Sequence, residues 1–116
     1  MTMATITDAQ IHDWWKSAAP YTIMILSTTA RYWTAPDRKG VVQDHERRMI
    51  SLQADGILPI VCPAAADSEL AGVGIFAADP DRTARIMDED PAVRAGLFSY
   101  AVHPCRSQPG SALPPR

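Results

Sequence analysis

The pattern of apolar and polar positions changes period along the chain, and each change predicts a different element. Residues 7–19 place Ile11 and Trp15 at helical spacing, which predicts an amphipathic helix that Pro20 ends. The next run, YTIMILSTT at 21–29, is apolar at even and odd positions alike. A strand wetted on one side would alternate, so we expect this strand to be covered on both faces.

A second helical period follows a loop, and it contains a titratable side chain. Residues 30–40 predict the loop, and residues 41–55 predict the helix, with Gly56 as its C-terminal stop. The apolar stripe of this helix includes Met49, and the position that completes the stripe is His45. A histidine on a face built for burial marks either a site of chemistry or a ring hydrogen-bonded to backbone at the edge of the core.

The rest of the pattern predicts a second helix and three further strands. Asp79 before Pro80 begins the helix with a capping side chain and a proline at its first position. Asp90 before Pro91 repeats this arrangement for one more turn. Pro59 indicates that its strand lies at a sheet edge, because proline has no N–H for a central ladder. The strands are expected at residues 57–63, 70–78 and 97–105.

The order of the core elements is β-α-β-β-α-β, which is the ferredoxin-like arrangement of the α+β class. Right-handed crossovers place both helices on one face of a four-stranded antiparallel sheet. The other face is then apolar and uncovered, and a patch of this kind marks an interface. We therefore expect a homodimer whose sheets pack face to face as a dimeric α/β-barrel. Coverage of that face by the N-terminal helix is the alternative.

The pattern divides the chain into an N-terminal helical extension at 1–20, a ferredoxin-like domain at 21–105 and an extended, Pro-rich tail at 106–116. A net charge of −2 without a basic patch argues against a nucleic-acid partner. No apolar run is long enough for a membrane span. With no secretory signal, and with Cys62 and Cys105 as the only cysteines, we expect a cytoplasmic protein with reduced thiols.

Two stretches carry a family resemblance. DPAVRAGLFSYAVHPC, at 90–105, resembles the C-terminal signature of YCII-related (YciI-like) proteins, in which an Asp-Pro-x-Val-x-Ala-Gly run enters the last strand. HERRMISLQADGILPIVCP, at 45–63, is similar to the family's histidine-bearing helix and the strand after it. The resemblance covers residues 21–105 and implies a ferredoxin-like protomer in a dimeric α/β-barrel. The chain departs from the family at Cys62, where glycine is usual.

YCII-related proteins are thought to use a histidine–aspartate pair as their active centre. The resemblance identifies His45 as the histidine and Asp90 as the aspartate, whereas Asp67 is matched only by its position after a strand-ending proline. The strand directions bring all three to one end of the domain, where a carboxylate can orient the imidazole as a general base. The alternatives are that Asp90 only caps its helix, that Asp67 only forms a turn, and that His45 bonds to backbone.

Aromatic side chains and a thiol are expected around this pair. Tyr32, Trp33 and Tyr100 are predicted to line a substrate pocket, and Cys62 to border it. Cys62 is a candidate nucleophile if it lies near an imidazole, although an isolated cysteine at a strand end is more often a small buried apolar residue. The sequence has no HExxH, no paired CxxC and no glycine-rich phosphate loop, so we expect neither a metal nor a cofactor.

Two classes of function fit these residues. In the first, a small cofactor-independent enzyme of the lyase or isomerase type moves protons on an organic acid, phenol or lactone. His45 abstracts or delivers the proton, and Asp90 or Asp67 orients the ring. Some YCII-like relatives act as dehydrochlorinases, so the resemblance implies that activity as one form. In the second, the same pocket binds a small molecule without catalysis, or the protein supports a partner enzyme. Cofactor-independent oxygenation is a third form, recognised by oxygen consumption.

Overall fold

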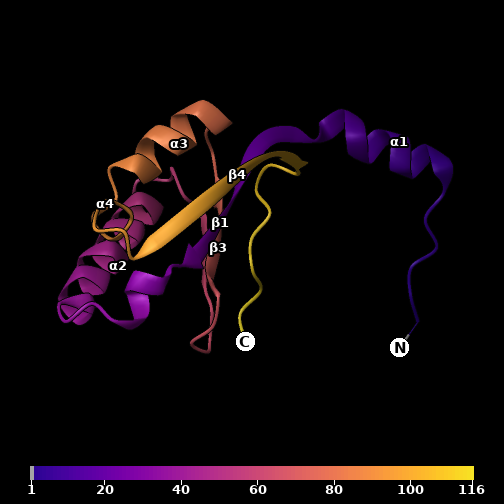
Figure 1. The fold of residues 1–116 in the computed structure, drawn as a ribbon. Helices are drawn as coiled ribbons and strands as arrows, with labels where there is room; N and C mark the ends of the chain where they lie inside the picture. Colours follow the sequence, from indigo (N-terminus) through magenta and orange to yellow (C-terminus); the bar gives the residue numbers. More distant parts are fainter. Residues whose placement is uncertain (1) are drawn as a thin grey trace.

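Four strands form one antiparallel sheet in the computed structural model, which describes residues 2–116. They are β1 (Ala19–Thr28), β2 (Ile60–Pro63), β3 (Leu70–Phe76) and β4 (Phe98–Ser107). The order in the sheet is β2-β3-β1-β4, so that β1 lies between β3 and β4 (Figure 1). This strand order is that of the ferredoxin-like fold, and the predicted α+β class is confirmed.

Three helices cover one face of this sheet (Figure 1). They are α2 (Arg38–Ala54), α3 (Pro80–Asp88) and α4 (Pro91–Arg94), while the short 3-10 helix η1 (Ala30–Trp33) connects β1 to α2 and α1 (Asp8–Ser17) precedes β1. As predicted, Asp79 caps α3 and Asp90 caps α4 through their side chains, each with a proline at the first helical position. Among the helices of residues 2–116, none has both the length and the apolar character needed to cross a membrane.

The largest differences from the predicted element boundaries lie at the starts of α2 and β2. Helix α2 begins at Arg38, inside the segment that was expected to be loop. Strand β2 begins only at Ile60, because the backbone N–H groups of residues 57–58 bond to the carbonyl oxygen of Leu52 at the end of α2. The prediction from Pro59 is confirmed in its main point, since β2 is an edge strand of the sheet.

The two faces of the sheet differ in burial. On β1, Thr22, Met24 and Leu26 are buried on the face that the helices cover. The intervening Ile23 and Ile25 are half-buried on the other face, so β1 is apolar on both sides as predicted. Within residues 2–116, no helix packs against that other face, which we call the open face (Figure 1).

Helix α1 stands apart from the sheet (Figure 1) and contains no buried residue. It starts with a capping box formed by Thr7 and Gln10. Its other end is anchored to β4 and the residue after it. Arg106 Nη2 donates to the carbonyl of Ala18 at 2.8 Å, and Gln108 Nε2 donates to that of Trp14 at 2.6 Å. The alternative in which this helix covers the open face is therefore wrong.

Candidate active site

The inward face of α2 presents His45 to Asp90, the capping residue of α4. The Nδ1 atom of His45 lies 2.9 Å from each carboxylate oxygen of Asp90. Both residues are buried, with 7% of His45 and 0% of Asp90 exposed. Of the two aspartates considered from sequence, Asp90 is thus the one that contacts the histidine.

Asp90 acts as a helix cap and as the partner of His45 at the same time. Its Oδ2 atom accepts hydrogen bonds from the backbone N–H groups of Ala92 and Val93, at 3.1 and 3.2 Å. Burial raises the pKa of Asp90, but the hydrogen bond and charge of His45 and the two backbone N–H groups together hold this pKa below its ordinary value. Asp90 is therefore an ionised acceptor, and capping and pairing are not alternatives at this residue.

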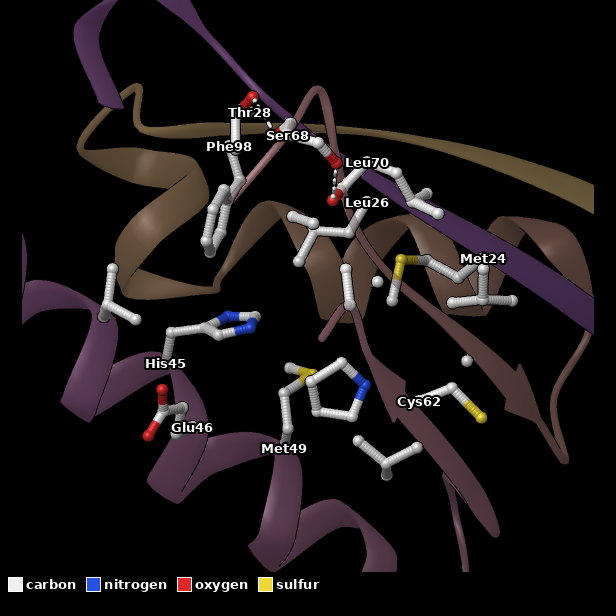
Figure 2. Close-up of a pocket in the computed structure, with 18 of the residues that line it drawn as sticks. Met24, Leu26, Thr28, His45, Glu46, Met49, Cys62, Ser68, Leu70 and Phe98 are labelled. Carbon is white, nitrogen blue, oxygen red and sulfur yellow. Dashed lines mark hydrogen bonds between the residues drawn. The ribbon is translucent and has the colours of Figure 1, made fainter. Parts of the chain in front are cut away.

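The ionised carboxylate fixes the tautomer of the imidazole. Because Asp90 can only accept hydrogen bonds, the Nδ1 atom of His45 must carry the proton that it donates. The lone pair of a neutral ring is then on Nε2, which has no hydrogen-bond partner within residues 2–116. Figure 2 shows the ring reaching from α2 into a cavity, between Phe98 and Met49. His45 is therefore placed to take a proton from a molecule in that cavity.

The cavity measures about 370 Å³, within the range that suits a small organic ligand. Its walls are mainly aliphatic, thioether and aromatic, and Gly72 and Gly74 contribute no side chain to the part of the wall that the middle of β3 forms. A methyl group at either position would meet a neighbouring atom. A Cβ atom on Gly72 would lie 2.9 Å from the Cys62 carbonyl oxygen, and one on Gly74 would lie 2.8 Å from Leu58 Cδ1.

Polar groups gather on the loop between β2 and β3, beside the cavity. The Tyr32 hydroxyl lies 3.5 Å from Asp67 Oδ1, and both residues line the cavity. Thr28 Oγ1 donates to the backbone carbonyl of Ser68 at 3.0 Å, which ties the same loop to β1 (Figure 2). Asp67 is therefore part of the cavity wall, but its hydrogen bond is to Tyr32 rather than to the imidazole.

Two of the predicted lining residues lie elsewhere. The Tyr100 hydroxyl donates to Asp88 Oδ1 at 2.5 Å and lies 3.1 Å from the carbonyl oxygen of Ala84, because β4 packs against α3 at this position. Burial, together with the hydrogen bond and charge of Asp88, raises the pKa of Tyr100 to about 12. Trp33 is 49% exposed and contacts the cavity only through the edge of Tyr32. Cys62 does border the cavity, from the exposed strand β2.

Sequence reasoning missed three residues around the pair: Phe98, Glu46 and Arg48. Phe98 packs its ring against His45, and Glu46 lines the cavity one position after it. Arg48 Nη1 lies 3.6 Å from Asp90 Oδ1. The spacing of three residues from His45 could have indicated Arg48, because such positions share a helix face. Within residues 2–116, no three His, Cys, Asp or Glu side chains lie close enough together to hold a metal ion.

Comparison with known proteins supports the fold. No protein-family model matches the chain, and no curated protein sequence matches it. Among solved structures, it is similar to 5-chloro-2-hydroxyhydroquinone dehydrochlorinase (TftG) from Burkholderia phenoliruptrix AC1100, determined in complex with 2,5-dihydroxybenzoquinone. The match has a TM-score of 0.51 and 14% sequence identity, and it covers 72% of this chain and 90% of that chain. At this identity the likeness extends to the fold alone.

Proposed function

We propose that this protein is a YCII-like, cofactor-independent enzyme of the lyase or isomerase type that transfers protons on a small organic substrate. The observation that carries the proposal is the buried His45–Asp90 pair, with Nδ1 of the ring 2.9 Å from the carboxylate and the ring facing a cavity. A histidine whose tautomer is fixed in this way is a general base with its free nitrogen aimed at the ligand.

The proposed chemistry needs one proton acceptor and one orienting carboxylate. Nε2 of His45 removes a proton from the bound molecule, and Asp90 stabilises the imidazolium that forms. In an isomerisation, the imidazolium returns that proton to a different atom of the same molecule. In an elimination, the proton leaves from one position, and a leaving group such as chloride departs from another with its bonding electron pair.

The cavity favours a small, flat and largely apolar substrate with polar substituents, of which a hydroxylated aromatic ring is the clearest example. The backbone of β3 at Gly72 and Gly74 offers a flat surface, and the rings of Phe98 and Tyr32 offer an aromatic one. Tyr32 and Asp67 are proposed to contact a polar substituent beside the loop. The similar fold of a dehydrochlorinase bound to 2,5-dihydroxybenzoquinone makes chlorinated hydroquinols the first compounds to assay.

The test compares the wild type with His45→Gln, and uses His12→Gln on exposed α1 as the matched control. Chloride release from 5-chloro-2-hydroxyhydroquinone and from related halogenated hydroquinols is followed, and binding of 2,5-dihydroxybenzoquinone is measured by calorimetry. We expect His45→Gln to lose about 100-fold or more in turnover and to bind the quinone as the wild type does. His12→Gln should retain both properties.

The same experiment separates catalysis from binding alone. If the wild type binds the quinone but turns over none of the halogenated or isomerisable compounds, the non-catalytic binding or accessory role replaces the proposal. If His45→Gln retains full turnover, the histidine is not the base. A variant that only unfolds at lower temperature, with binding and turnover unchanged once folded, would identify His45 as a packing residue.

We also propose that two copies associate through the open face of the sheet. On that face, Ile25 of β1 lies between Val73 of β3 and Ala101 of β4, and Ile23 lies beside Ile75. These side chains form a contiguous apolar surface that no helix of residues 2–116 covers. A sheet-to-sheet homodimer would bury it and leave both cavities on the outer, helical side.

A further inference from the structure

Arg48 lies against the buried carboxylate of Asp90 and forms a charged cluster with the His45–Asp90 pair. The two oxygens of Asp90 have different neighbours. Both lie 2.9 Å from His45 Nδ1, but Oδ2 also accepts from two backbone N–H groups, whereas Oδ1 has no backbone donor and faces Arg48 Nη1 at 3.6 Å. That Nη1 atom is buried and has no hydrogen-bond partner within residues 2–116. Burying a guanidinium nitrogen without a hydrogen bond lowers the stability of the fold. Its position beside Oδ1 therefore suggests an electrostatic role.

The charges around the pair explain what Arg48 does there. Besides Asp90, four charged side chains lie near the pair or at the cavity. Arg48 faces Asp90, Glu89 lies beside Arg48, and Glu46 and Asp67 line the cavity. Glu89 is exposed and lies 4.0 Å from Arg48 Nη2, and Glu46 and Asp67 are exposed at the cavity. Arg48 is therefore the one cation among these four side chains, and it is the one that lies against buried Asp90.

We propose that Arg48 is a positioning residue for the His45–Asp90 pair. Its guanidinium holds Oδ1 of Asp90 in place and balances the carboxylate charge, so that this charge does not draw a second proton onto the imidazole. This inference rests on the proposed function for its catalytic meaning, but the coupling of Arg48 to His45 through Asp90 is measurable without any substrate.

The first test is a titration followed by NMR. The chain has three histidines, so the Cε1–H signal of His45 is assigned with His45→Gln, and His12 and His103 serve as internal references. We expect the titration midpoint of His45 to move to higher pH in Arg48→Met and to stay near the wild-type midpoint in Arg48→Lys, which keeps the charge. An unchanged midpoint in a folded Arg48→Met protein would overturn the proposal, even if that variant melts earlier.

A second readout requires no substitution. In the wild-type protein, the side-chain Nε–H signal of Arg48 should shift with the same midpoint as His45, because a charge that appears on the imidazole changes the electrostatic field at the nearby guanidinium. If the chemical shift of Arg48 does not change as His45 titrates, the proposal is overturned, even where Arg48→Met fails to fold.

Turnover separates this proposal from the proposed function. If the enzyme acts on one of the halogenated hydroquinols, Arg48→Met should lower kcat about 10-fold with little change in KM, and should move the acidic limb of the pH profile upward. If no compound is turned over but both NMR shifts occur, Arg48 positions a binding site and only the catalytic function fails.

Discussion

The ring of Phe98 lies edge-on to the imidazole of His45, with centroids 5.0 Å apart and an angle of 70° between the planes. Tyr32 stacks on Phe98, with centroids 5.5 Å apart and the rings 22° from parallel. The guanidinium of Arg38 lies over the Tyr32 ring, 4.8 Å from its centroid. His45 is thus held by Asp90 through its Nδ1 and by an aromatic series against its ring, and each restraint can be removed separately.

Replacing Phe98 removes the aromatic restraint. Phe98→Leu should cost about 1 kcal/mol of unfolding free energy, and Phe98→Ala about 3–5 kcal/mol, because the ring is buried. Urea denaturation measures both values. Phe76→Leu is the matched control, since Phe76 is also buried but lies in the core on β3 outside the cavity wall. Quinone binding should weaken in Phe98→Leu and not in Phe76→Leu, and equal binding in both would contradict a role for Phe98 at the site.

Replacing Asp90 by Asn removes the charge between His45 and Arg48. The variant should lose about 3 kcal/mol of stability near neutral pH, because one member of a buried charged cluster is gone. The folded-state pKa of Asp90 is lower than its ordinary value of 3.8. Its contribution is therefore present above that value and is lost as the pH falls through the lower, folded-state pKa. The stability difference between wild type and variant should shrink on acidification below about pH 4.

Asp79→Asn is the control for the capping part of this effect. Asp79 caps α3 as Asp90 caps α4, with its side chain accepting from the backbone N–H of Arg82 at 2.7 Å. Asparagine caps a helix about as well as aspartate, so the change should be within about 0.5 kcal/mol. Chemical denaturation at several pH values gives both comparisons. Equal losses in the two variants would mean that Asp90 is a cap and little more.

The sequence predicted these elements because their signals are local. An aspartate before a proline caps a helix wherever the chain goes, and the run at 21–29 shows directly that both faces of β1 are apolar. His45 was found for the same reason, since it interrupts an apolar stripe. Arg48 was not found, because an arginine within the run HERRM has the appearance of a solvated helix face. Its spacing of three residues from His45 places it on the same helix face, and the position of Asp90 shows that it lies against buried charge.

Tyr100 shows a different limit of sequence reasoning. An aromatic side chain favours a place in a pocket lined by other rings. The position of Tyr100 along β4, however, brings it against α3, and the sequence does not show where α3 crosses the strand. Near the start of the strand Phe98 lines the cavity, while Tyr100, two residues later, bonds to α3. Which of two residues on one strand face reaches a site is a tertiary property.

The Tyr100 hydroxyl should titrate late. Its pKa is raised to about 12 because burial and the bond to Asp88 favour the neutral phenol in the folded chain. A raised pKa of this kind stabilises the fold below the ordinary value of 10.0, and the contribution is lost as the pH rises from there toward 12. Ultraviolet titration of the three tyrosines should show one late phase, absent in Tyr100→Phe. Quinone binding at neutral pH should be unchanged in that variant, and a loss of binding would show that Tyr100 contributes to the binding site.

The two glycines of β3 should differ in their tolerance of a methyl group. A Cβ on Gly72 would lie 2.9 Å from the backbone carbonyl oxygen of Cys62, which cannot move without disturbing β2. A Cβ on Gly74 would lie 2.8 Å from the end of the Leu58 side chain, which can rotate away. Gly72→Ala should therefore cost about 3 kcal/mol and Gly74→Ala about 1 kcal/mol. Thermal unfolding measures the order, and the reverse order would mean that β2 yields more easily than the core.

The open face of the sheet provides the last prediction. If two copies pack through it, placing a charge at its centre should separate them. The subunit should stay folded, because Ile25 is only half-buried within its own chain. Ile25→Lys should sediment as a monomer at concentrations where the wild type is a dimer. Leu113→Lys, in the exposed tail, is the control and should leave the dimer intact. A wild type that is monomeric at micromolar concentration would contradict the sheet-to-sheet dimer. It would leave the proposal for the His45–Asp90 pair unaffected, since both residues and the cavity wall belong to one chain.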